Sequence, residues 1–396
     1  MGKIMRWICI GWVALAVVVG IQAQEKEPLQ VGVKVGTTYS DNRDGTDSDK
    51  EDNFDVFAQP RIDLILDDGQ TSLDFFLAPS VTWRSNPRDN DEPSPQNDED
   101  VYVYLGAVFQ QKFSEATVLR LADDFSYTDD PNIDLGGVSV REDESHYYNA
   151  VRADFSTMLG ETYGVQVLGA NSIKRYDEDV VADEEDEDVY KVDGIFRVLL
   201  GNGLKGLAQV GYSDFQNEST TVDRGAQIMT YAVGLEKDMT AKLKGVVKGG
   251  VQTVEYSNDE LDSDTTGYGA AELMLSESAT RVAVGVGYGF YGPYVRPYSS
   301  QTRTYVSAKV ERDIGSKLTL AAEGQFGRGE YEKERISATQ ELPGGDDDMW
   351  LGALKGTYQV HRNVDLELGY QIEDWDSDVR ESFTRNLVTA AVKASL

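Results

Sequence analysis

A period of two runs through most of this sequence and limits what the chain can fold into. Over residues 54–66 the even positions are nearly all apolar, with Phe54 and Ile62 among them, whereas the odd positions include Asp55 and Arg61. Such an alternation puts apolar and polar side chains on opposite faces of a β-strand. It recurs over residues 71–84, 100–113, 281–290 and 364–371. These runs exceed the usual length of about five or six residues in soluble sheets and are typical of membrane-crossing barrel strands.

The breaks between the runs alternate between short and long. Eight short turns are expected at 67–70, 114–116, 160–162, 201–203, 237–239, 276–278, 314–316 and 361–363. Nine mostly longer loops are expected at 41–52, 85–98, 129–143, 177–188, 216–222, 257–264, 292–300, 331–346 and 377–382. Seventeen connections join eighteen strands, and short periplasmic turns opposite longer outer loops are typical of transmembrane barrels.

We therefore predict an all-β fold, a transmembrane antiparallel up-and-down β-barrel of about 18 strands with both termini on the periplasmic side. Residues 383–396 are expected to close the barrel against residues 29–40, because an open edge would leave unpaired amides in hydrocarbon. Aromatic residues near the strand ends are expected to form interfacial belts. These residues are Tyr39, Trp83, Tyr127, Tyr147, Tyr212, Tyr256, Phe290, Trp350 and Trp375.

The N-terminus predicts export. Lys3 and Arg6 precede an apolar run over residues 7–21 that ends near the small residue Ala23. This order of a positive start, an apolar core and a small residue is typical of a cleaved signal peptide. We expect residues 1–23 to be the signal peptide and residues 24–396 to be a single barrel domain in the outer membrane of a Gram-negative bacterium.

The charge of the chain argues against nucleic acid as a partner. The formal net charge is −32 at pH 7, and phosphate recognition requires a basic surface. With 21 Tyr, 13 Phe and 38 Gly, the composition suits a β-architecture rather than an acidic disordered chain.

Enzymatic chemistry is not expected, and neither is a cofactor. The chain has two histidines, His146 and His361, and membrane hydrolases usually pair a histidine with a nucleophile or a carboxylate. His361 falls in a predicted turn, and His146 is interpreted as a solvated residue at a loop edge. Gly285 and Gly287 alternate with apolar residues, so they belong to a strand and not to a phosphate-binding loop.

Acidic loops are the one feature that suggests a metal. Carboxylate oxygens suit calcium, but the loops lack EF-hand spacing, and runs of acidic residues are usually solvated. No metal site is predicted, and the weak candidates are Asp183, Glu184, Glu185 and Asp186.

Basic residues on the polar face of the strands are more informative. If the apolar face meets lipid, the polar face lines the interior, which then carries a mixed and slightly basic set of charges. The candidates for lining the lumen are Arg61, Arg84, Lys112, Arg120, Arg152, Arg197, Lys244, Lys248, Arg281 and Arg303. Two interpretations stay open: an ion-paired filling of the barrel, or a channel whose basic lumen passes anionic solutes.

Two short patterns give the chain a family resemblance. One is the first strand and its continuation, residues 32–42; the other is the last hairpin, with Leu368-Gly369-Tyr370, Asp374-Trp375-Asp376-Ser377 and residues 383–388. In these the mature chain resembles the putative β-barrel porin 2 family of Gram-negative outer-membrane proteins, whose members often accompany exopolysaccharide systems. The chain ends in Leu396, where such barrels more often end in Phe.

The resemblance and the patterns together favour a porin-like channel for anionic saccharide or exopolysaccharide. The alternative is a non-conducting structural or adhesion barrel with acidic, cation-binding outer loops. The expected partners are outer-membrane lipid and lipopolysaccharide, the periplasmic barrel-assembly machinery and, for a channel, a saccharide.

Overall fold

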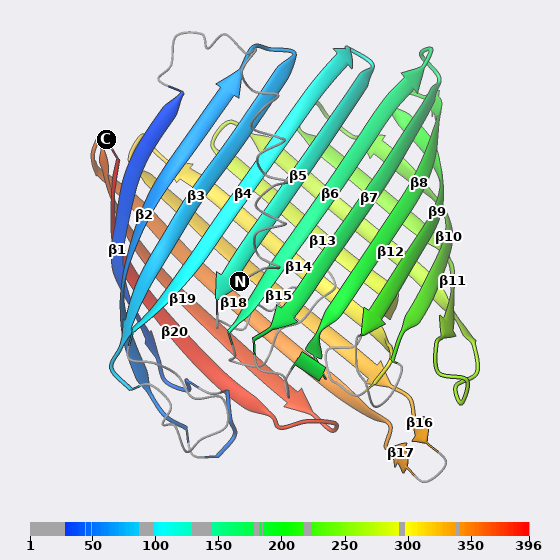
Figure 1. Cartoon of the computed structure of the whole chain (residues 1–396). Coiled ribbons are helices and arrows are strands. Elements are labelled where there is room, and N and C mark those ends of the chain that lie inside the picture. The colour runs from blue at the N-terminus through cyan, green and yellow to red at the C-terminus, as the bar shows by residue number, and fades with distance from the viewer. Residues whose placement is uncertain are drawn as a thin grey trace, which may run out of the picture.

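A computed structural model describes residues 28–43, 45–48, 50–86, 99–128, 145–177, 182–183, 185–217, 224–292, 298–337 and 340–395. It confirms the predicted fold class, an all-β closed antiparallel barrel of 18 strands (Figure 1). The predicted signal peptide, residues 1–23, lies outside the described residues. Within the part of the chain that is described, no helix combines the length and the apolar character needed to cross a membrane.

The barrel strands follow one another along the chain. They are β1 (Leu29–Ser40), β2 (Asn53–Asp67), β3 (Thr71–Arg84), β4 (Glu99–Ser114), β5 (Thr117–Thr128), β6 (His146–Leu159), β7 (Tyr163–Tyr176), β8 (Glu187–Gly201), β9 (Leu204–Asn217), β10 (Ala226–Asp238), β11 (Leu243–Tyr256), β12 (Asp264–Glu277), β13 (Thr280–Tyr291), β14 (Gln301–Ile314), β15 (Leu318–Tyr331), β18 (Gly345–His361), β19 (Val364–Ser377) and β20 (Phe383–Ser395). A separate small hairpin, β16 (Glu334–Ser337) and β17 (Gln340–Leu342), lies in the connection between β15 and β18.

Each barrel strand pairs with its neighbours in the chain, and the ends of the sheet pair with each other. β20 lies antiparallel to β1, from Gly32 opposite Ser395 to Ser40 opposite Leu387. This is the closure expected from the sequence, and it satisfies the backbone groups of both edge strands. The short turns all lie at one end of the barrel and the longer connections at the other, where β16 and β17 project (Figure 1).

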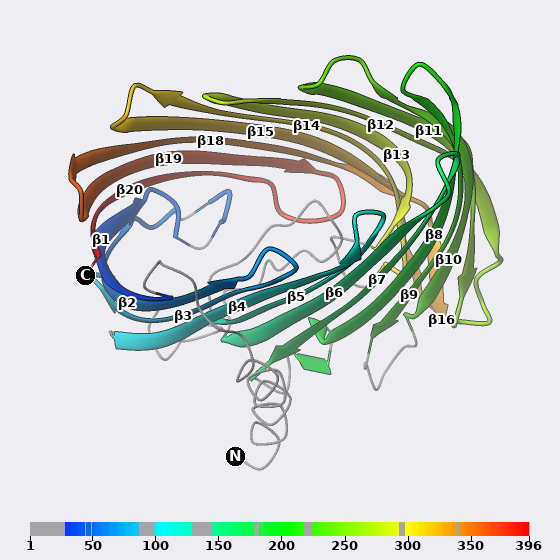
Figure 2. The ribbon, with the colours of Figure 1, turned by 90° about the horizontal axis from the view of Figure 1, so that it is seen from above.

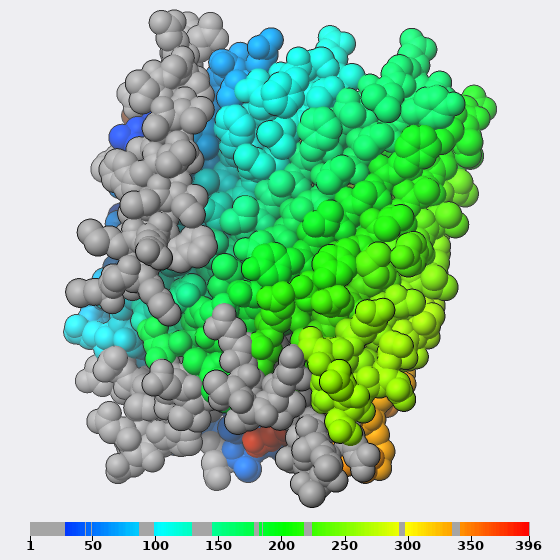
Figure 3. Space-filling model, turned by 45° about the vertical axis from the view of Figure 1, so that its right-hand side comes forward, coloured from blue at the N-terminus to red at the C-terminus, as the bar shows by residue number. Residues whose placement is uncertain are grey.

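The two faces of the wall differ as the alternation predicts. The outward face presents large apolar side chains, among them Val31, Val233 and Leu368, of which Val233 and Leu368 are 68% and 66% exposed. So much exposed apolar surface in water would be unfavourable, whereas a lipid environment accepts it. In the space-filling view the side chains of the green strands pack into a continuous wall (Figure 3).

The belt prediction is wrong for three aromatic residues. Tyr39 and Trp83 point outward and are 40% exposed. By contrast, Trp375 is 2% exposed and Phe290 is 6% exposed, because both belong to buried clusters at the end of the barrel that carries the long connections, and Tyr256 packs against one of those clusters. For Trp375 the register explains the difference, since it lies between Met349 and Phe383 on the inward face.

The connection after β1 and the turn after β19 bend into the outline of the barrel when it is viewed along its axis (Figure 2). Asn42 is fully buried there, and its Nδ2 donates to the Thr384 carbonyl at 2.9 Å and to the Thr46 carbonyl at 2.8 Å. The end with the long connections is therefore narrower than the barrel wall alone would make it.

Candidate functional site

The inner surface of the barrel is the candidate site. The strand registers place all ten predicted lumen residues on the inward face: Arg61, Arg84, Lys112, Arg120, Arg152, Arg197, Lys244, Lys248, Arg281 and Arg303. Their surroundings differ, and three kinds of environment can be distinguished.

Near the end with the short turns, three cations surround one carboxylate. Glu236 on β10 lies 2.8 Å from Lys205 Nζ, 3.1 Å from Lys244 Nζ and 3.2 Å from Arg197 Nε. Arg197 also donates to Gln166, at 2.7 Å, and Gln166 in turn donates to Asp154. The strand register brings these side chains together from β6 to β11. Arg197, Lys205 and Lys244 thus share one buried carboxylate, that of Glu236.

A second group lies where the barrel closes. Glu367 on β19 lies 2.9 Å from Lys34 Nζ on β1 and 3.2 Å from Lys355 Nζ on β18. Again one carboxylate contacts two ammonium groups, since β18 pairs directly with β19 on one side and β1 lies two strands away, beyond β20, on the other.

The ion pairs of the middle wall share one orientation. The Glu236 side chain is 4% exposed and that of its partner Lys244 is 39%, whereas Glu367 is 13% exposed and Lys355 is 54%. Likewise, the Lys309 side chain is more exposed than that of Glu323, and the Arg281 side chain is more exposed than that of Glu311. Because the carboxylates lie against the wall and the cations extend over them, the surface that faces the lumen is more basic than the residue count implies.

Two predicted residues lie nearer the end with the long connections and are buried. The Arg84 side chain is 5% exposed and pairs with Asp100 at 2.5 Å. Arg303 is fully buried, with its guanidinium carbon 4.1 Å from the centre of the Tyr291 ring. These two side chains therefore pack against the inner wall and do not extend into the lumen.

Two apolar clusters line the same end, and neither was predicted from the sequence. One includes Tyr176, Phe215 and Val254. The other includes Trp375 and Tyr331. The second cluster is covered by Arg380, whose guanidinium carbon lies 3.7 Å from the Trp375 ring centre and which donates twice to Asp347, at 3.0 and 2.9 Å. The sequence does contain a signal for these clusters, because several of their aromatic residues occupy strand positions that alternate with the lipid-facing ones and therefore point inward.

The weak metal candidates make other contacts. Glu184 lies outside the described residues. Glu185 accepts from Lys174 Nζ at 3.2 Å, and Asp186 accepts from the Tyr176 amide at 2.8 Å. Within the described ranges no group of three or more ligand-type side chains could hold a metal ion.

The histidines lie at opposite ends of the barrel. His146, at the start of β6, is 1% exposed, with its ring centre 5.1 Å from that of Tyr176. The interpretation of His146 as solvated is therefore wrong, because β6 begins inside an aromatic cluster. His361 is exposed at the end of β18, next to a short turn.

Comparison with known proteins agrees with this architecture. The family described as putative beta-barrel porin 2 matches residues 213–396. The expected family is thus confirmed over this segment. The matched segment contains the last-hairpin pattern, and the first-strand pattern lies outside it. The chain forms a porin-like β-barrel, and no curated protein matches it.

Solved structures that align with this porin-like barrel are remote in sequence. The BenF-like porin from Pseudomonas fluorescens Pf-5 is 11% identical, with a TM-score of 0.47, and the alignment covers 93% of this chain and 99% of that one. The outer membrane protein opdK from Pseudomonas aeruginosa is 13% identical, with a TM-score of 0.47 and the same coverage. OccAB4 from Acinetobacter baumannii is 12% identical, with a TM-score of 0.46, and the alignment covers 94% and 99% of the two chains.

Proposed function

We propose that this barrel is an outer-membrane channel that favours anionic solutes, with anionic saccharides and exopolysaccharide as the expected class. The orientation of the lumenal ion pairs carries the proposal. In the middle of the wall, the carboxylates of Glu236, Glu311, Glu323 and Glu367 are each less exposed than the cations that they contact, so a solute there meets ammonium and guanidinium groups first. Oriented charge in a confined space concentrates ions of the opposite sign.

Saccharide as the preferred class rests on the family resemblance and on the mixture of amide, hydroxyl and basic side chains along the inner wall, such as Gln166, Ser307 and Lys309. Such groups can exchange hydrogen bonds with a polyhydroxylated solute as it passes. Outer-membrane lipid and lipopolysaccharide are the proposed partners of the apolar outward face.

Ion selectivity tests the proposal. The purified barrel is inserted into planar bilayers, and the reversal potential is measured across a gradient of potassium chloride. We expect the sign of the reversal potential to show that chloride permeates more readily than potassium. The double variant Lys244→Gln and Lys355→Gln should have a smaller reversal potential. A clearly cation-selective channel would contradict the proposal.

One observation favours a second candidate, a barrel that conducts nothing and serves structure or adhesion. The two apolar clusters and the inward-bending connections narrow the end with the long connections. If so, the intact protein shows no current, and a variant lacking residues 45–48 and 378–382 shows none either. A current that appears only after this deletion indicates a channel gated by the loops.

A further inference from the structure

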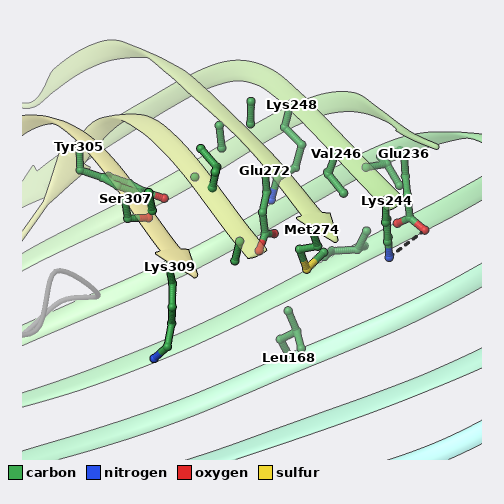
Figure 4. Close-up of a pocket in the computed structure, with 18 of the residues that line it drawn as sticks. Leu168, Glu236, Lys244, Val246, Lys248, Glu272, Met274, Tyr305, Ser307 and Lys309 are labelled. Atoms are coloured by element: carbon green, nitrogen blue, oxygen red, sulfur yellow. Dashed lines mark ion pairs between the residues drawn. The ribbon is translucent and has the colours of Figure 1, made fainter. Parts of the chain in front are cut away.

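A concave part of the inner wall lies on β11–β15. It is a cavity of about 610 Å³, and its walls include Lys248, Glu272, Tyr268, Tyr305, Ser307 and Lys309 (Figure 4). The depth comes from β13, whose inward positions carry only small residues over Ala283, Gly285, Gly287 and Gly289. On the neighbouring strands, several inward positions carry longer side chains, such as Tyr268 and Glu272 on β12 and Tyr305 and Lys309 on β14.

The glycines are needed to seat Tyr305. A Cβ atom built on Gly287 would lie 2.3 Å from Tyr305 Cε1 and 2.7 Å from Cζ, so the phenol ring rests directly on the backbone of β13. Tyr291 meets Tyr305 edge-on, with ring centres 6.0 Å apart. The ring is thus held from below and from one side, and Tyr305 lies on the wall of the cavity.

Lys248 lies in the same cross-strand row. Lys248 is opposite Ala270, Ala270 is opposite Gly287, and Gly287 is opposite Tyr305. Three strand spacings separate the ends of the row, about 14 Å in all. The two residues between them are small, so a space remains that is bounded by an ammonium group and an aromatic ring.

The ammonium of Lys248 has a neutral partner. It donates to Gln209 Oε1 at 2.8 Å, and although Asp193 and Glu272 attract it electrostatically, no ion pair within 4 Å joins it to a carboxylate among the described residues. Lys205, Lys244, Lys309 and Lys355 each contact a carboxylate. Lys248 can therefore take an anionic ligand without breaking an ion pair.

The next row supplies hydrogen-bonding groups. Glu272 is opposite Gly285, which is opposite Ser307, and Ser307 is opposite Gln325. In this row the carboxylate of Glu272, the hydroxyl of Ser307 and the amide of Gln325 lie beside the small residues of β13. Pockets that combine an apolar surface with a few placed polar groups are typical of small-molecule sites.

We propose that this cavity is a subsite for a carboxylated sugar. The sugar ring lies against Tyr305, its carboxylate pairs with Lys248, and its hydroxyl groups exchange hydrogen bonds with Glu272, Ser307 and Gln325. The proposal deepens the channel function, since it rests on a solute reaching the lumen, and it adds the place where that solute pauses. A sugar offers an apolar ring face to an aromatic side chain, and a uronic acid adds the charge that Lys248 can accept.

Equilibrium binding in detergent tests the subsite without requiring conductance. Titration calorimetry is carried out on the full barrel with D-glucuronate and with D-glucose. We expect glucuronate to bind more tightly than glucose, and we expect Lys248→Met and Tyr305→Ala each to weaken glucuronate about tenfold or more, whereas Tyr305→Phe stays within about twofold of the wild type.

Lys355→Met is the matched control, because it removes one exposed lumenal charge outside the cavity. If Lys355→Met weakens glucuronate as much as Lys248→Met does, the general charge of the lumen binds the sugar and the subsite is wrong. Equal affinity of the wild type for glucose and glucuronate also overturns it. A barrel that passes chloride but binds no glucuronate refutes the subsite alone, whereas a barrel that binds glucuronate but passes no current refutes the channel alone.

Discussion

Asn149 Nδ2 donates a 2.6 Å hydrogen bond to Asp123 Oδ1 on the outward face of the barrel. Asp123 follows Leu121 and precedes Phe125 on the apolar parity of β5, and Asn149 has the same parity on β6. Both lie well inside their strands, between Tyr127 and Tyr147 at one end and Phe155 toward the other. An acidic group at this depth faces hydrocarbon, where an unsatisfied polar atom is costly.

Asn149→Leu should destabilise the barrel by about 1–3 kcal/mol, because it removes a donor from a carboxylate that water does not reach. Urea titration of the barrel folded in lipid vesicles measures the change. Thr37→Leu, an outward-facing substitution on β1, is the control. The double substitution Asp123→Leu and Asn149→Leu should recover most of the loss, since it removes both polar groups. If Asn149→Leu is as harmless as Thr37→Leu, the pair does not face hydrocarbon.

Glu236→Gln should increase anion selectivity and lower stability. The substitution leaves Lys205, Lys244 and Arg197 without the carboxylate that they share, and removing one member of a buried charge group is strongly unfavourable. We expect a loss of about 1–3 kcal/mol, reduced from the fully buried case because the three cations are partly solvated.

Glu311→Gln gives the comparison for Glu236, because Glu311 meets one well-exposed partner, Arg281, at 2.7 Å. It should change stability by less than about 1 kcal/mol. Urea midpoints and reversal potentials report both effects. Equal losses for the two variants would show that the cations around Glu236 act independently of one another.

Two prolines interrupt the ladder between β2 and β3. Pairing stops after Ala58 opposite Val81 and resumes at Ile62 opposite Leu77, and the unchanged register puts Pro60 opposite Pro79. Neither residue has an amide donor. Replacing both prolines by Val should stabilise the barrel by about 1 kcal/mol per hydrogen bond gained. A higher midpoint in urea unfolding would measure this gain. Replacing one alone should give about half the gain, and no gain from the pair would mean that the two strands cannot approach there.

The contact between the β13–β14 connection and β16 should weaken as pH rises. Burial raises the pKa of Glu334 above its ordinary value of 4.5, although hydrogen bonds from the Ser299 amide, at 3.0 Å to each carboxylate oxygen, oppose the shift. The docked state therefore binds a proton more tightly than the undocked state. Docking is strongest below the ordinary pKa and weakens as pH rises through the raised value.

Hydrogen exchange of the Ser299 amide, corrected for its intrinsic pH dependence, follows this docking. Protection should fall as pH rises from about 4.5, and Glu334→Gln should abolish the trend. Glu332→Gln, an exposed substitution on the same connection, should leave it intact. Protection that increases with pH in the wild type would contradict the proposed linkage.

The period-two pattern predicted a good deal of the barrel. The expected closing pair, residues 29–40 and 383–396, corresponds closely to β1 and β20, and the eight short turns fall where strands reverse. Local alternation suffices for this because each strand must present one continuous apolar face to lipid. The same parity rule put Arg197 and Lys248 on the inward face.

Parity by itself could not show which inward residues meet. The approach of Lys205, Lys244 and Arg197 to Glu236 depends on the register between four neighbouring strands, and the seat of Tyr305 depends on Gly287 lying opposite it. Trp375 was expected at the lipid interface, yet it faces inward, because an aromatic residue near a strand end can serve either face.

The sequence alone therefore determined that the chain is a closed barrel with an apolar outside and a charged inside, since both follow from a period repeated along each strand. Only the tertiary structure decided where carboxylates lie beneath cations and where a row of small residues opens a cavity beside Lys248. These features arise between strands that are distant in sequence, where hydrogen-bond register and wall curvature set the distances.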